Sequence, residues 1–299
     1  NTGTDTIYSA TISWTFNGTT QNYNWSGILL PLYGMDTILL DSIVFVSGDN
    51  SLSVWVSNPN NKTDLNTMND TLSLTIYSCA LVLNGAYIVG DSPNADFSLT
   101  EVAAILHNCG VSGPVVLQME SGIYPEIELD EVYPGMSNTN TITLTSLAID
   151  PDSVIFQSTS TALLLNEVSN FNFRYVTFDA SSGKYGVELK GTCSNIEFYG
   201  CKIKADPSST EITNATSSTI SSAGVYYANT STSNKYLGNV RFIKNHIDGG
   251  SSNIFIVYMA SVNTQMGSVA SVTIDSNILT NAYSQGIHSY YNGYYPSIS

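Results

Sequence analysis

Short strands separated by Asn- and Asp-rich turns, one amphipathic helix, and a segment that recurs four times predict an all-β chain in two parts. We expect residues 1–78 to form a partial immunoglobulin-like β-sandwich that lacks its N-terminal strand or strands. We expect residues 79–299 to form a right-handed parallel β-helix, with an N-terminal capping helix inside residues 79–113.

The charge balance excludes several classes of partner. The net charge of the 299 residues is −15, with 9 Lys and Arg against 24 Asp and Glu. So acidic a chain lacks the cationic surface that nucleic acid requires, and anionic lipid surfaces would repel it. No apolar run approaches the ~20 residues of a membrane-spanning helix, so we expect no membrane insertion. The composition, poor in Lys and rich in Ser, Thr, Asn and Tyr, favours an extracellular location.

The first part consists of alternating apolar and polar residues between turns. In "TISWTFNG" the residues Ile12, Trp14 and Phe16 share one face of a strand. Further strands are expected in "DTILLDSIVF" (36–45), "SLSVWVS" (51–57) and "DTLSLTIYS" (70–78). Because the chain opens on what reads as a turn, we expect the domain to begin before residue 1.

The turn "NPNNKTDLNTMND" (58–70) offers a candidate calcium site. Its oxygen donors at short spacing, Asp64, Asn66, Asn69 and Asp70, are of the kind that a hard cation binds. The alternative is that these side chains cap their own backbone turns, in which case the protein holds no cofactor.

The runs "ISWTFNGTTQNYNWSG" and "VWVSNPNNKTDLNTMNDTL" resemble adhesion-type immunoglobulin-like modules of bacterial surface proteins. In those modules a W-x-x-N-G, a W-x-G and a P-N-x-x-x-D-x-N-x-x-N-D segment follow one another in this order. The resemblance covers most of residues 4–76. It implies a spacer module in which none of the motif positions is catalytic.

A single helix is expected at the start of the second part. Ser98 and Glu101 form a capping-box pattern, and Gly110 ends the helix. The apolar stripe consists of Leu99, Val102, Ile105 and Leu106. A helix at this point would cover the open edge of a stack of strands.

The later residues repeat. The segments "SNFNFRYVTFD" (169–179), "SNIEFYGCKIK" (194–204), "GNVRFIKNHID" (238–248) and "ASVTIDSNILT" (270–280) align position by position, and a shorter strand follows each. Three aligned positions are apolar throughout: Phe171, Ile196, Val240 and Val272; Phe173, Phe198, Phe242 and Ile274; Phe178, Ile203, Ile247 and Leu279. Such columns are typical of stacked coils of a parallel β-helix. The alignment also stacks Asn245 on Asn277, where side-chain amides can bond to each other and to the turn.

The charges of the third repeat fall in outward columns, about 4.8 Å from their neighbours. Glu197 should meet Arg241, and Lys204 should lie between Asp179 and Asp248. His246 is expected to be exposed and solitary, because its column otherwise holds Thr177, Lys202 and Ile278.

The alternative interpretation of these charges is a catalytic site of a glycosidase or a lyase. Asp179 and Asp248 would lie roughly 9–10 Å apart, near the spacing of an inverting glycosidase pair. However, Lys204 would keep both ionised, whereas the catalytic acid needs a raised pKa. A lyase needs clustered cations, and the cations of the coils are dispersed in the sequence. We therefore predict no catalytic residue and no enzymatic activity.

The run "GAYIVGDSPNADFSLTEVAAILHNCGVSGPVVLQMESGIYPEIELDEV", followed by "NTNTITLTS", resembles the cap and first coils of β-helix regions in large adhesin-like surface proteins. Those proteins belong to bacteria that export through type IX secretion. The resemblance implies display on the bacterial outer surface. It covers residues 85–165 well and the later coils only through the repeat pattern.

Covalent features remain open. In bacteria of this kind an Asp-Ser/Thr-aliphatic triplet can mark O-glycosylation, and it occurs at Thr6, Thr37, Ser42, Thr71 and Ser153. The four cysteines, Cys79, Cys109, Cys193 and Cys201, allow three pairings or buried free thiols.

The function favoured by the sequence is a stalk or adhesin segment of a large secreted surface protein. Its partners would be further domains of the same polypeptide beyond Ser299, secretion or surface machinery, and glycans. Candidate tyrosines for stacking on sugar rings are Tyr226, Tyr227, Tyr258, Tyr290, Tyr291, Tyr294 and Tyr295. The alternative is a β-helix that binds or degrades polysaccharide, as a lyase or a glycoside hydrolase.

Overall fold

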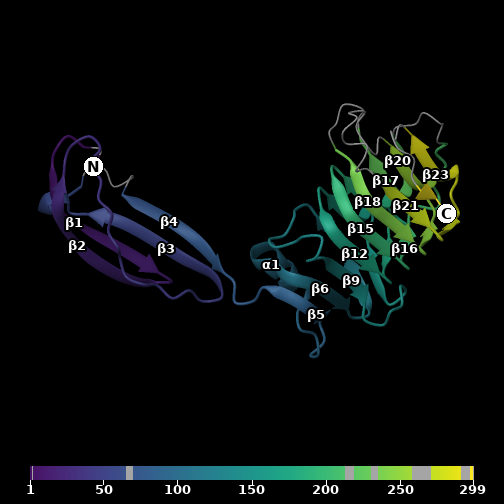
Figure 1. Cartoon of the computed structure of the whole chain (residues 1–299), viewed down its shortest axis with the longest axis horizontal. Coiled ribbons are helices and arrows are strands. Elements are labelled where there is room, and N and C mark those ends of the chain that lie inside the picture. Colours follow the sequence, from purple (N-terminus) through teal and green to yellow (C-terminus); the bar gives the residue numbers. More distant parts are fainter. Residues whose placement is uncertain are drawn as a thin grey trace. The chain divides into compact units, whose positions relative to one another are not determined.

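A computed structural model describes residues 1, 3–64, 70–212, 219–229, 235–257, 271–290 and, for the backbone alone, 297–298 (Figure 1). The chain divides into two compact units, Asn1–Leu81 and Val82–Ser299. The predicted boundary follows residue 78. Each unit is described by itself.

The first unit contains one antiparallel sheet, in the order β2 (Thr19–Leu29), β1 (Ile7–Phe16), β3 (Gly48–Ser57) and β4 (Thr71–Ser78), with a short 3-10 turn at Pro59–Asn61. The register places Ile12 and Trp14 beside Val56 and Val54, so the predicted apolar face exists. Within the described part of this unit the strands form this single sheet. The two-sheet sandwich therefore remains a prediction.

The strand expected in residues 36–45 is wrong, because that segment has no regular secondary structure. It is held instead by side chains on the apolar face of the sheet. The ring of Phe45 packs edge-on against Phe16 with centroids 5.4 Å apart. The indole N–H of Trp25 donates to a carboxylate oxygen of Asp36 at 2.7 Å. The alternating apolar residues of the segment are at most half-buried, and no described strand lies beside it to complete a ladder.

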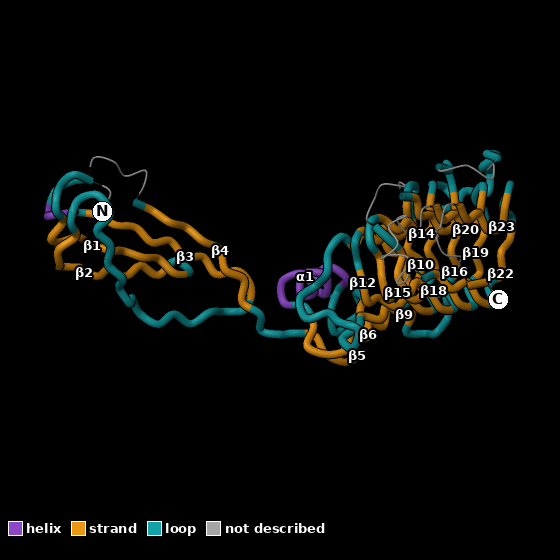
Figure 2. Tube along the Cα trace, turned by 45° about the horizontal axis from the view of Figure 1, so that its top comes forward, coloured by secondary structure: helices purple, strands orange, loops and turns teal. Residues whose placement is uncertain are grey.

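The second unit is a parallel β-helix built from three parallel sheets (Figures 1 and 2). The large sheet contains β5 (Leu83–Val89), β6 (Val111–Met119), β9 (Ile142–Ser146), β12 (Ser169–Arg174), β15 (Cys193–Tyr199), β18 (Leu237–Ile243), β21 (Val272–Asp275) and β24 (Ser297–Ile298). The first small sheet contains β7 (Gly122–Pro125), β10 (Val154–Gln157), β13 (Thr177–Asp179), β16 (Lys202–Lys204), β19 (His246–Asp248) and β22 (Ile278–Thr280). The second small sheet contains β8 (Ile127–Leu129), β11 (Thr161–Asn166), β14 (Tyr185–Lys190), β17 (Ala223–Ala228), β20 (Ser252–Val257) and β23 (Gln285–Tyr290). From β6 onward the chain visits the three sheets in this order in every coil.

The repeat alignment is confirmed by the register of the strands. Phe173 pairs with Phe198, and Phe198 pairs with Phe242. Their rings stack with centroids 5.0 Å apart at both steps, and all three are fully buried. Phe178, Ile203 and Ile247 follow one another in the first small sheet in the same way.

The predicted asparagine stack is also confirmed. Asn245 is buried, and its amide donates to the side-chain oxygen of Asn277 at 3.0 Å and to the carbonyl of Phe198 at 3.0 Å. Its own side-chain oxygen accepts from the backbone N–H of Cys201 at 2.9 Å. One side chain thus satisfies two backbone groups at the bend of the preceding coil.

The predicted helix is present as α1 (Leu99–Cys109) with the expected capping box. The N–H of Ser98 donates to Glu101 at 2.8 Å, and hydrogen bonds from Ser98 hold the pKa of Glu101 below its ordinary value. Val102 and Leu106 are buried in the same apolar cluster as the coils. Figure 2 shows the helix beside β5 and β6, at the N-terminal end of the stack.

The cysteines divide into two kinds. Cys79 and Cys109 are disulfide-bonded, whereas Cys193 and Cys201 are buried free thiols. Burial raises the pKa of Cys193 to about 11 and that of Cys201 to about 12, so both thiols stay protonated.

Candidate functional site

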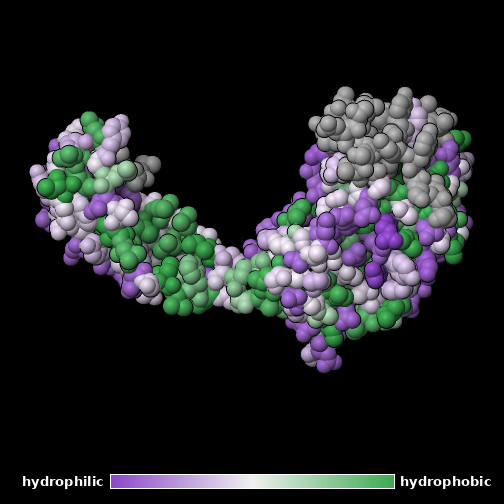
Figure 3. Space-filling model, viewed as in Figure 1, coloured by the Kyte–Doolittle hydropathy of each residue, from purple (hydrophilic) through white to green (hydrophobic). Residues whose placement is uncertain are grey.

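The outer face of the large sheet gathers most of the polar chemistry of the coils. Because side chains alternate along a strand, Asn172, Glu197 and Arg241 point outward from neighbouring strands and stand in one column. Figure 3 shows hydrophilic side chains concentrated over this part of the β-helix.

Glu197 is the centre of an ion-pair group. The expected pair with Arg241 is present, with the guanidinium nitrogen 2.9 Å from the carboxylate. Arg174 approaches the other oxygen of Glu197 at 2.9 Å, which the column alignment did not predict. The Glu197 side chain is only 14% exposed, whereas both arginines are 46% exposed. The carboxylate is therefore enclosed, and the guanidinium groups reach solvent.

A tyrosine holds further cations beside this group. The guanidinium of Arg174 lies over the ring of Tyr199 at 5.9 Å, and the ammonium of Lys244 lies over it at 5.5 Å. Lys244 also donates to the Tyr199 hydroxyl at 3.3 Å. Three of the cations that looked dispersed in the sequence, Arg174, Arg241 and Lys244, are thus brought together here.

An asparagine ladder borders the column at the bend before these strands. The amide of Asn195 donates to Asn138 at 2.8 Å and to Asn170 at 3.1 Å, and the amide of Asn239 donates to Asn195 at 3.0 Å. Asn170, Asn195 and Asn239 have positive φ angles of 65°, 52° and 54°, a conformation that Asn tolerates well. This ladder was missed, although Asn occupies the second position in three of the four aligned repeats.

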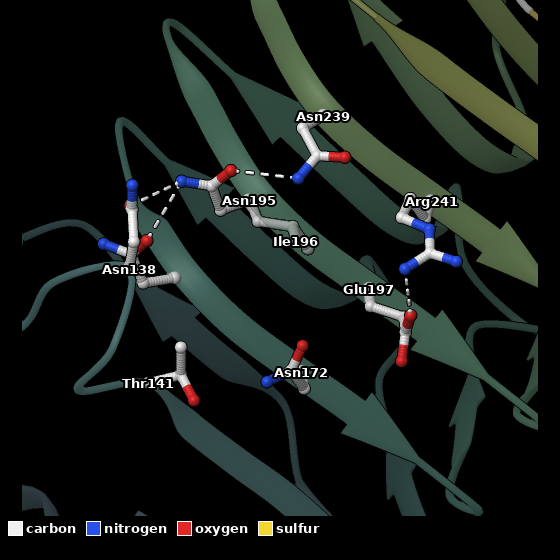
Figure 4. Close-up of a pocket in the computed structure, with 9 residues that line it drawn as sticks. Asn138, Thr141, Asn172, Asn195, Ile196, Glu197, Asn239 and Arg241 are labelled. Carbon is white, nitrogen blue, oxygen red and sulfur yellow. Dashed lines mark hydrogen bonds and ion pairs between the residues drawn. The ribbon is translucent and has the colours of Figure 1, made fainter. Parts of the chain in front are cut away.

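The ladder and the ion-pair group enclose a cleft of about 290 Å³ (Figure 4). Its lining is Asn138, Thr141, Asn170, Asn172, Asn195, Ile196, Glu197, Asn239 and Arg241. In Figure 4 the side chain of Asn172 lies between Thr141 and Glu197. Its amide donates to Thr143 at 3.3 Å, while its oxygen takes part in no hydrogen bond with described residues. Amides, a guanidinium and a carboxylate can recognise hydroxyl or anionic groups of a polar ligand.

The charged residues in the outward column of the first small sheet bond to their own neighbours. Asp179, Lys204, Asp248 and Thr280 follow one another as expected. Lys204 lies 3.2 Å from Asp179, whereas Asp248 accepts from Thr280 and Asn281, each at 2.6 Å. Burial would raise the pKa of Asp179, but hydrogen bonds from Ser181 and the charge of Lys204 outweigh it, and the pKa lies below its ordinary value.

His246 is not the exposed, solitary residue that the sequence suggested. Its Nε2 lies 2.8 Å from the hydroxyl of Thr280, which donates to Asp248. His246 is half-buried in this contact. The adjacent strand β22 supplies the partner through its threonine, which an alignment of charged residues alone does not reveal.

The tyrosine candidates for sugar stacking have different environments. The prediction for Tyr227 is wrong, because its ring is fully buried in the core and cannot stack on a sugar. Tyr226 is half-buried and stacks between Tyr185 at 4.2 Å and Phe255 at 5.6 Å. Tyr290 is half-buried and packs against a second apolar cluster, to which Tyr226 and Phe255 also belong. Tyr258, Tyr291, Tyr294 and Tyr295 lie outside the described residues.

Two other candidates are only partly covered. Of the calcium set, Asp64 and Asp70 are described, and Asn66 and Asn69 lie outside the described residues. Among described residues no group of three or more His, Cys, Asp or Glu could hold a metal ion. Among the glycosylation candidates, Thr37, Ser42 and Thr71 are exposed, and Thr6 and Ser153 are half-buried. No described helix is long and apolar enough to cross a bilayer.

Comparisons with known proteins add little. No family matches the chain, and no curated protein matches it. Among solved structures, a pectin methylesterase from carrot is similar at 10% identity with a TM-score of 0.33, over 75% of this chain and 85% of that one. A likeness this remote carries no conclusion about the activity of the present chain.

Proposed function

We propose that this chain is a non-catalytic segment of a large secreted cell-surface protein, in which the β-helix is a stalk with an adhesive outer face. The observation that supports it most is the pairing of opposite charges on the outer faces of the sheets. Glu197 lies between two arginines, and Asp179 is bonded to Lys204. Carboxylates paired with cations in this way can present a polar surface along a rod. The lowered pKa of Asp179 also makes this carboxylate a poor proton donor.

The finer parts of the proposal rest on the resemblances and on the placement of elements. The first unit would be an immunoglobulin-like spacer, and the helix α1 would cap a right-handed β-helix by shielding its first apolar layer. The chain would be exported by type IX secretion to the bacterial outer surface. The exposed Thr37, Ser42 and Thr71 would be the best-placed sites for O-glycans.

The second candidate function is polysaccharide cleavage. One observation favours it: Asp179 and Asp248 stand two strands apart in one column, a separation of roughly 9–10 Å. The lowered pKa of Asp179 argues against a role for it as the acid. Asp248 would have to supply the proton, although it accepts hydrogen bonds from two neighbours.

One paired experiment distinguishes these functions. The chain is screened on a glycan array and is also incubated with acidic and neutral polysaccharides, with reducing ends measured over time. The proposal expects binding without release of reducing ends. Release that Asp248→Asn abolishes, while Asp152→Asn leaves it intact, would establish an enzyme. Asp152 is a suitable control because it is a carboxylate on the same side of the coils that bonds to Lys202.

A further inference from the structure

We propose that the cleft on the large sheet binds an acidic saccharide, whose carboxylate lies against Arg241 and whose hydroxyl groups bond to the asparagine amides. This inference rests on the proposed adhesive function and names its site and its class of ligand. It is argued from the charge, the unused hydrogen-bond capacity and the rigidity of the cleft.

The charge of this face differs from that of the chain. The whole chain has 9 Lys and Arg against 24 Asp and Glu. Arg241 lines the cleft, and Arg174 and Lys244 lie beside it over the Tyr199 ring. The carboxylates on the outward columns of these strands are Glu197 and Asp275, so the cations exceed them by one. A local excess of positive charge on an acidic protein would attract an anionic ligand here and discourage its binding elsewhere.

The guanidinium groups have donors to spare. Each guanidinium carries five N–H donors, and the bond of Arg241 to Glu197 uses one nitrogen. Arg241 is exposed, so its remaining donors face the solvent that a ligand would replace. The planar fork of an arginine matches a carboxylate in a bidentate geometry, which a lysine does not offer.

The enclosed Glu197 is better suited to positioning than to binding. It forms ion pairs with Arg174 and Arg241 at the same time and so restrains both guanidinium groups. The Tyr199 ring lies in the column next to that of Glu197, and it restrains Arg174 and Lys244. Because these side chains are already ordered, less rotamer entropy is lost when a ligand binds.

The amides supply the complementary acceptors. In the ladder the amide nitrogens of Asn195 and Asn239 are used as donors, and the side-chain oxygen of Asn239 has no partner among described residues. The side-chain oxygen of Asn172 is likewise unused within the described part of the chain. Two carbonyl oxygens near a guanidinium fit a sugar ring, which carries hydroxyl donors beside its carboxylate.

The size of the cleft limits the ligand. At about 290 Å³ it lies at the lower end of the range of ligand clefts, so it would hold only a few sugar rings. Binding at one such site would be weak. Repeated sites on a polymer, or many copies of the protein on one surface, would raise the overall affinity through multivalency.

The test uses the full chain and a panel of uronate, sialate and sulfated oligosaccharides. Each is paired with its carboxyl-reduced or desulfated counterpart, which keeps the sugar skeleton and removes the charge. Calorimetric titration is expected to show binding to a carboxylate-bearing member and a loss of roughly tenfold or more on carboxyl reduction. Affinity should also fall as salt is added.

The variants locate the site. Arg241→Gln should weaken binding by roughly tenfold or more, and Asn172→Ala by a few fold. The matched control is Lys202→Gln, which removes one partly exposed charge from the first small sheet, where Lys202 bonds to Asp152. It should leave binding unchanged. Melting curves of all three variants confirm that each folds.

Three outcomes would overturn the inference. These are equal binding of the charged and reduced forms, equal loss in Arg241→Gln and Lys202→Gln, and failure of every acidic saccharide to bind. Binding of a glycan that ignores Arg241 would leave the adhesive function in place and move its site. Cleavage of a polysaccharide would instead refute the proposed function itself.

Discussion

The inner and outer sides of the same strands are built on different physical principles. On the inner side of β12, β15 and β18, the rings of Phe173, Phe198 and Phe242 stack in full burial. On the outer side of these strands, Glu197 joins two half-exposed arginines. The inner column contributes stability through apolar burial, while the outer column contributes little stability and leaves donors for a ligand. Alternate residues of the same strands therefore serve folding and the proposed recognition separately.

The largest effect is expected from the inner column. Phe198→Ala should lower the free energy of unfolding by about 3–5 kcal/mol, because it removes a ring that is stacked on both sides. Urea unfolding followed by circular dichroism measures the change. Phe198→Leu, which keeps most of the apolar volume, should cost clearly less. A loss below about 1 kcal/mol for the alanine variant would show that the coils do not share one packed core.

An intermediate loss of stability is expected from removing a buried polar side chain. Asn245→Ala should cost about 1–3 kcal/mol, because it leaves the N–H of Cys201 and the carbonyl of Phe198 without a partner. Asn172→Ala is the matched change on the outer side and should cost less than about 0.5 kcal/mol. Equal costs in the same unfolding assay would remove the distinction between the two sides.

A small effect, about 0.2–1 kcal/mol, is expected for the salt bridge of Lys204 and Asp179. The pKa of Asp179 is lowered in the folded state from its ordinary value of 3.8. The carboxylate therefore stabilises the fold above that value, and the contribution disappears as the pH falls through the lower folded pKa. Asp179→Asn should reduce the fall in stability between about pH 5 and about pH 3. An unchanged pH profile in the variant would contradict this assignment.

The sequence predicted the inner columns well because the alternation and the coil repeat act together. Once Phe198 is placed inside, the register of its neighbours follows, and so does the contact of Glu197 with Arg241. The asparagine stack at Asn245 was predictable for the same reason. The asparagine ladder could have been found in the same alignment, because Asn recurs at one position.

Other features depend on geometry that a column alignment does not contain. Arg174 belongs to the column of Tyr199 and reaches Glu197 diagonally, because its side chain is long. Lys204 bonds to one of its two neighbouring carboxylates, since Asp248 has partners from the next turn. Tyr226 and Tyr227 are adjacent in one strand, so their side chains point to opposite faces, and that of Tyr227 points into the core. The segment 36–45 alternates like a strand but has no described neighbour.

The most direct test of the central claim is to measure binding and cleavage on one sample. A uronate polymer that the chain binds is incubated with it for a day, and its chain length is then compared with that of an untreated sample by size-exclusion chromatography. The account predicts a retained complex, an unchanged chain length, and loss of the complex in Arg241→Gln. Shortening of the polymer that Asp248→Asn prevents would contradict it and make the column of Asp179 and Asp248 an active site.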